Sequence, residues 1–277
     1  MKKKIVAIGG GENGRLLEDG TFAPYNTQKI DEEIVKLSNK ENPHFLFINH
    51  AMPSLEIQES YFQTMQKIYG NKFNCICKNL KTIELDDKLK VKEKIEWADI
   101  IYEGGGDTAY MINLWKNTGF DKFLYDAWNK GKVICGVSAG AVCWFKSCNS
   151  EDSNNNCFKS VDCLDWINLH LTPHCNEKGR YESTKLQLKS NNLIGIMLSN
   201  CAALEILNDQ YKLILSDEEA YGTKAYWNNN EYIEEKILIS NEFKYINELL
   251  NKKEIIKQIA KDRNVNKNEI YMYFLEK

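Results

Sequence analysis

One serine in this 277-residue chain stands in a pattern that suits nucleophilic catalysis. The segment Gly136-Val137-Ser138-Ala139-Gly140 matches G-x-S-x-G, between an apolar run typical of a buried strand and a stretch that predicts a helix. A sharp strand-to-helix turn exposes the serine hydroxyl, and amides at the start of the helix can stabilise an oxyanion. The simpler alternative is a glycine-flanked serine that caps a helix.

Two further glycine clusters follow predicted strands. Gly104-Gly105-Gly106-Asp107 permits close approach of the backbone to a ligand. Phosphate binding is the rival interpretation, but neither G-x-x-x-x-G-K-[ST] nor G-x-G-x-x-G occurs there. We therefore interpret this loop as a source of oxyanion-hole amides facing Ser138. Gly9-Gly10-Gly11 is either a tight turn or a wall of the site.

A serine nucleophile needs a general base, and the chain has only four histidines. His174 follows Pro173, which ends the strand-like segment INLHLTPH and places His174 in a loop at the strand end. We predict His174 as the base. His44 begins a strand and His170 lies within one, so both are interpreted as structural, whereas His50 follows a strand and is a weaker candidate for the site.

Short apolar runs alternate with helical spacing through the first half of the chain. Strands are predicted over Lys4–Ile8, His44–Asn49, Phe73–Cys77, Asp99–Tyr102 and Lys132–Gly136, and helices over Ile30–Leu37, Ser54–Ile68, Asp86–Glu96, Thr108–Lys116 and Asp121–Asn129. This order predicts an α/β fold: a doubly wound, mostly parallel sheet flanked by helices. The three glycine motifs fall at carboxyl ends of strands, where such sheets bind ligands.

The second half is richer in strands. Strands are predicted over Ile167–Leu171, Leu193–Leu198, Ala202–Leu207 and Tyr211–Leu215, with a helix over Tyr181–Lys189. The polar, Asn-rich segment Ser147–Lys159 predicts an exposed loop. Helices over Glu242–Leu250 and Lys253–Asp262 form a short helical C-terminal extension. We expect an α/β domain over residues 1–235 and an extension, 236–277, packed on the same domain.

Composition excludes several classes of protein. With 36 Lys+Arg against 39 Asp+Glu, the net charge of −3 gives no electrostatic basis for nucleic-acid binding. No apolar run is long enough for a membrane span, and the apolar start is too short for a secretory signal. The nine cysteines form no C-x-x-C pair, and Pro173 interrupts His170-x-x-x-His174, so we expect reduced thiols, no metal, no cofactor and a cytoplasmic location.

These motifs, taken in order, resemble peptidase family S51, which contains peptidase E (aspartyl dipeptidase) and the cyanophycinases. The resemblance rests on IVAIGGG, IIYEGGGDT, GVSAGAVCWF, an acid near Asp152, TPHC and IGIMLSNCAAL, and covers Lys3 to Trp227. It implies a flavodoxin-like fold related to class I amidotransferases. It further implies a serine hydrolase of small peptides with Ser138 as nucleophile, His174 as base and oxyanion-hole amides from Gly105, Gly106 and Ala139.

The family's third triad residue, Glu or Asp, corresponds to Asn200 in this chain. Asparagine can accept a hydrogen bond from the imidazole but supplies no charge, and an Asp→Asn change in the chymotrypsin triad lowers kcat about 10⁴-fold. Three interpretations remain open. Asn200 orients His174 in a slower enzyme, a nearby acid such as Glu205 or Asp152 substitutes, or activity is lost and the protein is a pseudoenzyme that binds a peptide or amino acid.

Specificity is left open. The resemblance places Gly104, Asp107 and Arg180 in substrate binding: Arg180 matches an arginine of members that take acidic substrates, whereas Asp107 replaces an asparagine and would repel an acidic side chain. A solvated arginine is the alternative for Arg180.

An esterase whose triad acid is Asp152, Asp162 or Asp165 is a further alternative to the peptidase function. A homodimer is compatible with the sequence.

Overall fold

The first part of the chain alternates buried strands with helices, as the hydrophobic periodicity predicts. The computed structural model describes residues 2–15, 17, 19–152, 157–238, 244–245 and 266. The helices are α1 (Gln28–Leu37), α2 (Leu55–Met65), η1 (a π-helical stretch, Gln66–Lys72), η2 (a 3₁₀ turn, Thr82–Glu84), α3 (Lys88–Trp97), α4 (Thr108–Thr118), α5 (Phe120–Asn129), α6 (Ala139–Val142) and α7 (Arg180–Asn191). The strands are β1 (Lys4–Ile8), β2 (His44–Ile48), β3 (Ile76–Leu80), β4 (Ile100–Glu103), β5 (Val133–Val137), β6 (Phe145–Asp152), β7 (Cys157–Asp162), β8 (Ile167–Thr172), β9 (Gly195–Leu198), β10 (Ala202–Leu207), β11 (Gln210–Leu215), β12 (Gly222–Asn228), β13 (Glu231–Lys236) and β14 (Lys244–Tyr245).

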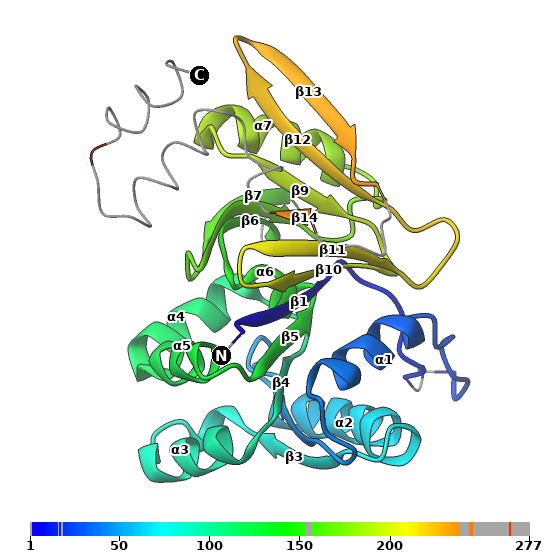
Figure 1. Cartoon of the computed structure of the whole chain (residues 1–277), viewed down its shortest axis with the longest axis vertical. Coiled ribbons are helices and arrows are strands. Elements are labelled where there is room, and N and C mark those ends of the chain that lie inside the picture. Colours follow the sequence, from blue (N-terminus) through cyan, green and yellow to red (C-terminus); the bar gives the residue numbers. More distant parts are fainter. Residues whose placement is uncertain are drawn as a thin grey trace.

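The larger sheet is covered by helices on both faces. Its order is β14-β11-β10-β1-β5-β4-β2-β3, and the strands from β1 to β3 in that order run parallel. Alternate residues of β1 enter two cores: Ile5 and Ala7 pack on the side of α3, α4 and α5, whereas Val6 and Ile8 pack on the side of α1 and α2 (Figure 1). This arrangement confirms the predicted α/β class, with parallel strands between two helical layers.

A smaller, second sheet follows α6, in the order β13-β12-β9-β8-β6-β7. The predicted exposed loop Ser147–Lys159 is wrong, because most of it forms the antiparallel β6–β7 hairpin of this sheet. Two buried side chains of β6, Ser147 and Asn149, are polar. Ser147 Oγ lies 2.9 Å from His170 Nδ1, and Asn149 Nδ2 donates to Thr184 Oγ1 over 2.9 Å. Hydrogen bonds inside the core therefore replace the apolar pattern that usually identifies a strand.

Most of the predicted C-terminal extension lies outside the described residues, including the helix predicted over Lys253–Asp262. Within the helix predicted over Glu242–Leu250, Lys244–Tyr245 are extended instead and form β14, which pairs antiparallel with β11. The division of the chain at residue 235 stays a prediction. In the described ranges, no helix combines the length and the apolar character that crossing a bilayer requires.

Close backbone contacts fix the turn after β5. The Gly140 N–H donates to Gly104 O over 3.1 Å, which ties the turn to the glycine loop after β4. A Cβ atom added at Gly140 would collide with the backbone oxygen of Glu103. Because neither partner is a movable side chain, this position requires the absence of a side chain.

We expect Gly140→Ala to lower the free energy of unfolding by about 1–3 kcal/mol, because the added methyl group must push two backbone segments apart. Gly70→Ala is the matched control, since its nearest neighbours would be at 3.5 Å or more and its backbone needs no positive φ. Urea unfolding of both variants measures the difference. Equal stabilities would contradict the packing described for the turn.

Candidate active site

The turn after β5 holds Ser138 in a strained conformation. Its φ of 55° and ψ of −114° lie in a region that residues other than glycine rarely occupy. The Ser138 N–H donates to Ile8 O of β1 over 3.0 Å, and its carbonyl accepts from Ala141 N over 2.9 Å. The side chain is half-buried, and no described residue forms a hydrogen bond with its hydroxyl. The hydroxyl is therefore available to a ligand.

The glycine loop after β4 lies against Ser138. A Cβ atom added at Gly105 would be 3.5 Å from Ser138 Cβ. Among the described residues, no acceptor takes up the N–H groups of Gly105, Gly106 or Ala139. Unpaired amides beside a serine hydroxyl are the donors that an oxyanion hole requires.

His174 lies in the loop after β8, with a positive φ of 49°. Its N–H donates to Gly9 O over 2.9 Å, and its Nδ1 lies 2.6 Å from Asn200 Oδ1. A Cβ atom at Gly10 would collide with both the imidazole and Asn200 Oδ1, so glycine leaves the space in which this pair sits. With Nδ1–H donating to Asn200, Nε2 keeps its lone pair for a proton.

Two consecutive carbonyl groups thus anchor the two predicted catalytic residues. Ile8 O binds the backbone of Ser138 and Gly9 O binds the backbone of His174. Successive carbonyls of an extended chain point in opposite directions, so the serine and the histidine flank the end of β1. The same edge carries Gly10, whose carbonyl accepts from Cys201 N over 2.9 Å. This geometry places Ser138, His174 and Asn200 around one glycine segment.

The environment of His174 favours the neutral imidazole. Burial lowers its pKa below the ordinary 6.5, and the Arg180 guanidinium lowers it further, whereas Asn200 and the carboxylates of Glu177 and Glu151 raise it. The net direction is downward. His174 is therefore mostly unprotonated at pH 7, the state that can accept a proton.

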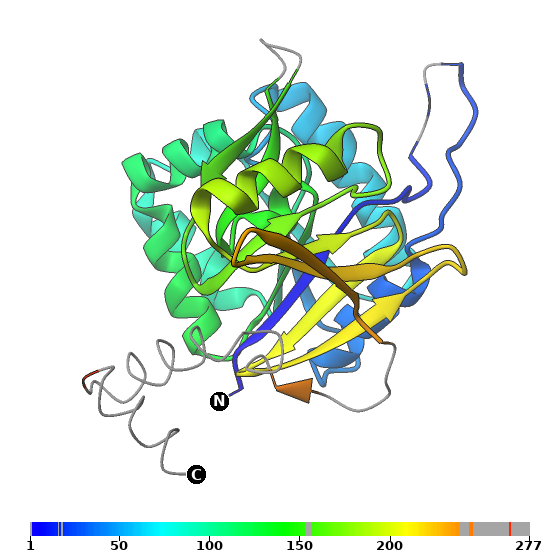
Figure 2. The same cartoon turned by 90° about the horizontal axis from the view of Figure 1, so that it is seen from above.

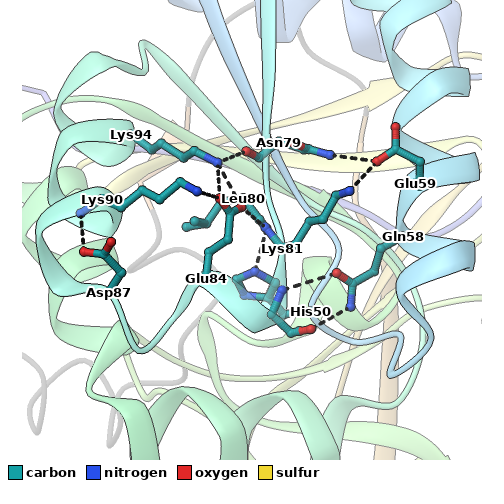
Figure 3. A network of polar contacts seen from close by, with 11 residues as sticks. His50, Gln58, Glu59, Asn79, Leu80, Lys81, Glu84, Asp87, Lys90 and Lys94 are labelled. Atoms are coloured by element: carbon teal, nitrogen blue, oxygen red, sulfur yellow. Dashed lines mark hydrogen bonds and ion pairs between the residues drawn. The ribbon is translucent and has the colours of Figure 1, made fainter.

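The other histidines are engaged elsewhere. His50 is fully buried: its Nδ1 accepts from Trp115 Nε1 over 3.0 Å, and its Nε2 donates to Leu80 O over 2.8 Å. Figure 3 shows this ring facing Leu80 within a polar network beside β3. His170 is also buried, and His44 begins β2 with its Nδ1 2.9 Å from Trp97 O. His50 therefore has a structural role, and the suggestion that it lines the site is wrong.

The acids that could replace the missing triad carboxylate are unequally placed. Glu205 is buried on β10, 3.0 Å from Lys212 Nζ, and Asp152 lies 3.0 Å from Lys159 Nζ in the β6–β7 hairpin. Glu177, by contrast, has its Oε1 3.4 Å from His174 Nδ1. Glu177 is not among the residues that the sequence motifs indicate, because its spacing of three residues from His174 does not by itself show that the carboxylate faces the imidazole.

The predicted substrate-binding residues are dispersed around the site. Arg180 starts α7 and is buried, with its guanidinium 3.5 Å from Glu177 and 3.8 Å from Glu151. Asp107 caps α4 by accepting from Tyr110 N over 2.9 Å. Gly104, the first residue of the glycine loop, is buried. Their roles toward a substrate stay predictions.

An open cleft of about 450 Å³ reaches the glycine segments at Gly11 and Gly105. Its remaining lining combines apolar and polar side chains: Glu12, Asn13, Arg15, Met52, Ile57, Ser60, Tyr61 and Thr64. Glu12 to Arg15 belong to a loop that projects from the rest of the molecule, drawn in dark blue in Figure 2. The volume falls in the range of small-ligand sites.

Comparisons with known proteins agree with this architecture. The model of peptidase family S51 matches residues 19–214, more than half of the chain. The uncharacterized peptidase YgaJ of Bacillus subtilis (strain 168) is 30% identical over 230 residues, which cover 81% of this chain and 91% of that protein. The uncharacterized peptidase Lmo0363 of Listeria monocytogenes (serovar 1/2a, strain EGD-e) is 29% identical over 101 residues, which cover 35% of this chain and 49% of that protein. The chain belongs to peptidase family S51.

A solved structure shares the fold. The crystal structure of a peptidase from an acI-B1 Actinobacterium superposes with a TM-score of 0.65 at 20% identity, covering 88% of this chain and 97% of that one. The resemblance that the motifs indicated is thus confirmed at the level of family and fold. Family membership makes the chain a hydrolase of the peptidase class.

We expect His50→Gln to be less destabilising at pH 5 than at pH 7. Burial lowers the pKa of His50 to about 4, so between pH 6.5 and pH 4 the unfolded chain binds a proton that the folded protein does not. The contribution of His50 to the free energy of unfolding of the wild-type protein is therefore fully present above pH 6.5 and is about 2 kcal/mol smaller at pH 5. Glutamine does not titrate, so the variant shows no such loss. Urea unfolding at both pH values measures the change. An equal cost at both pH values would contradict a buried, neutral His50.

Proposed function

We propose that this peptidase is a serine hydrolase that cleaves small peptides through an acyl-enzyme, with Ser138 as nucleophile and His174 as base. The observation that carries the proposal is the anchoring of both residues on consecutive carbonyls at the end of β1. A free hydroxyl, an imidazole with an available Nε2 and unpaired amides are the three parts that acyl transfer needs.

The mechanism follows from these parts. Ser138 Oγ attacks the carbonyl carbon of the peptide bond while His174 Nε2 takes the hydroxyl proton. The developing oxyanion accepts hydrogen bonds from the N–H groups of Gly105 and Ala139, with Gly106 beside them. His174 then gives its proton to the leaving amine, and water hydrolyses the acyl-enzyme by the same steps. Asn200 holds the Nδ1–H side of the ring throughout.

The size of the substrate is inferred from the cleft beside Gly105. Its volume of about 450 Å³ is compatible with a dipeptide or with the first residues of a peptide. Apolar contact is available from Met52, Ile57 and Tyr61, whereas Glu12 and Arg15 form an exposed ion pair at 3.0 Å on its rim. We therefore place the substrate chain along the glycine loops, with one side chain in the cleft.

A second function, binding of a peptide or amino acid without turnover, is favoured by one observation. Asn200, the residue bonded to His174 Nδ1, carries no charge and cannot stabilise an imidazolium as an acid does. Covalent labelling of the serine separates the two functions, because a binding protein does not need an activated hydroxyl.

We expect a fluorophosphonate probe to label Ser138, and Ser138→Ala to abolish labelling. His174→Ala should lower the labelling rate at least about 100-fold, because the base contributes roughly 10²–10⁴ to such reactions. Intact-mass measurement detects the adduct, and turnover of a dipeptide library tests hydrolysis. His170→Ala is the control, as His170 lies outside the site. An unlabelled wild-type protein, over the whole pH range of its stability, would support the binding function instead.

In its pH profile, the labelling rate should decrease toward low pH, and the midpoint of this decrease, the acid limb, should lie below pH 6.5. Burial lowers the pKa of His174, so the imidazole stays neutral, and able to accept the serine proton, to a lower pH than a histidine in water. The rate should be on its plateau at pH 7 and fall as the pH drops through the pKa of His174. Rate constants measured between pH 4.5 and pH 8 locate the limb. A midpoint above pH 6.5 would contradict this environment for His174.

A further inference from the structure

The Nδ1 side of His174 has two oxygen neighbours. Asn200 Oδ1 is at 2.6 Å and Glu177 Oε1 is at 3.4 Å. The amide oxygen of Asn200 can only accept, so Nδ1 carries the proton in this hydrogen bond. The Glu177 carboxylate then faces a ring that becomes positively charged when Nε2 is protonated. Asn200 and Glu177 thus provide separately what a single acid provides in a triad: an acceptor and a negative charge.

The position of Glu177 is fixed from two directions. Its N–H donates to His174 O over 2.9 Å, closing a turn that brings the two side chains to the same side. Its other oxygen, Oε2, lies 3.5 Å from Arg180 Nε. The Glu177 carboxylate therefore bridges the imidazole and a guanidinium.

Arg180 can serve as a fixed support because it is itself held. Its side chain is 7% exposed, with NH1 3.4 Å from Asn149 O and NH2 3.8 Å from Glu151. The guanidinium lies 4.6 Å from the centre of the Phe158 ring, within the distance of a cation–π contact.

We propose that Glu177 is a positioning residue that supplies the negative charge missing at Asn200, so that an Asn200–Glu177 pair replaces the usual triad acid. This inference rests on the proposed function. When Ser138 gives its proton to Nε2, the imidazolium forms beside the Glu177 carboxylate, which does not itself take the proton. Asn200 fixes the ring, and Glu177 lowers the energy of the charged intermediate.

The charged groups that face His174 are Glu177, Glu151 and Arg180. If the charge of Glu177 is removed, only Glu151 still raises the pKa of His174, while Arg180 continues to lower it. Protonation of the ring should therefore become harder. In Glu177→Gln we therefore expect the acid limb of labelling to move to lower pH and the plateau rate to fall roughly 5- to 30-fold, less than for a fully buried acid because Glu177 is 47% exposed. A purely structural role would lower the rate without moving the limb.

Glu182→Gln is the matched control. Glu182 is an exposed acid in the first turn of α7. Its replacement by glutamine removes the same negative charge near the site, but from a side chain that does not face the His174 ring. This variant should label as the wild-type protein does. Asn200→Asp in the Glu177→Gln background should restore the rate and return the limb toward higher pH, because it puts a carboxylate back at Nδ1.

NMR titration of the His174 imidazole tests the same contact without any reaction. Its pKa should fall in Glu177→Gln and stay unchanged in Glu182→Gln, with thermal unfolding confirming that each variant is folded. An unchanged pKa of His174 would overturn the inference even if Ser138 is labelled, and so would a lowered pKa with an unchanged labelling rate. Absence of labelling in the wild-type protein would overturn the proposed function instead, and with it the role in catalysis.

Discussion

The site depends on the backbone at the end of β1. Ile8 O holds the Ser138 N–H and Gly9 O holds the His174 N–H, while Gly10 O holds the Cys201 N–H next to Asn200. Three chain segments, arriving from β5, β8 and β9, are therefore joined to one short stretch of main chain. A glycine at position 10 is needed because any side chain there would occupy the volume of the imidazole. The two sheets meet at this stretch. The same main-chain hydrogen bonds therefore hold the two sheets together and position the residues of the site.

Much of this arrangement could be predicted from the sequence because its signals are local. The G-x-S-x-G pattern needs only a strand and a helix on either side of Ser138, and both are present as β5 and α6. Elimination among four histidines identified His174, and the structure joins it to Asn200. The parallel order of the first strands followed from the strand–helix alternation. The catalytic roles of these residues stay predictions.

What could not be predicted depends on contacts between distant segments. The β6 strand looks like a loop because Ser147 and Asn149 are polar, and only their bonds to His170 and Thr184 explain their burial. Glu177 looks like an ordinary surface acid in a polar turn. Its relation to His174 depends on the positive φ of that histidine and on the buried Arg180, neither of which sequence spacing reveals.

Main-chain atoms hold the serine and the histidine, whereas the groups beside Nδ1 are side chains alone. The backbone positions of Ser138 and His174 therefore do not depend on which side chain occupies position 200. One substitution among the side chains beside Nδ1 can then change the charge that faces the imidazole, with no backbone rearrangement. A change of side chain at position 200 would thus alter the polar surroundings of the imidazole while the main-chain hydrogen bonds of Ser138 and His174 stay in place.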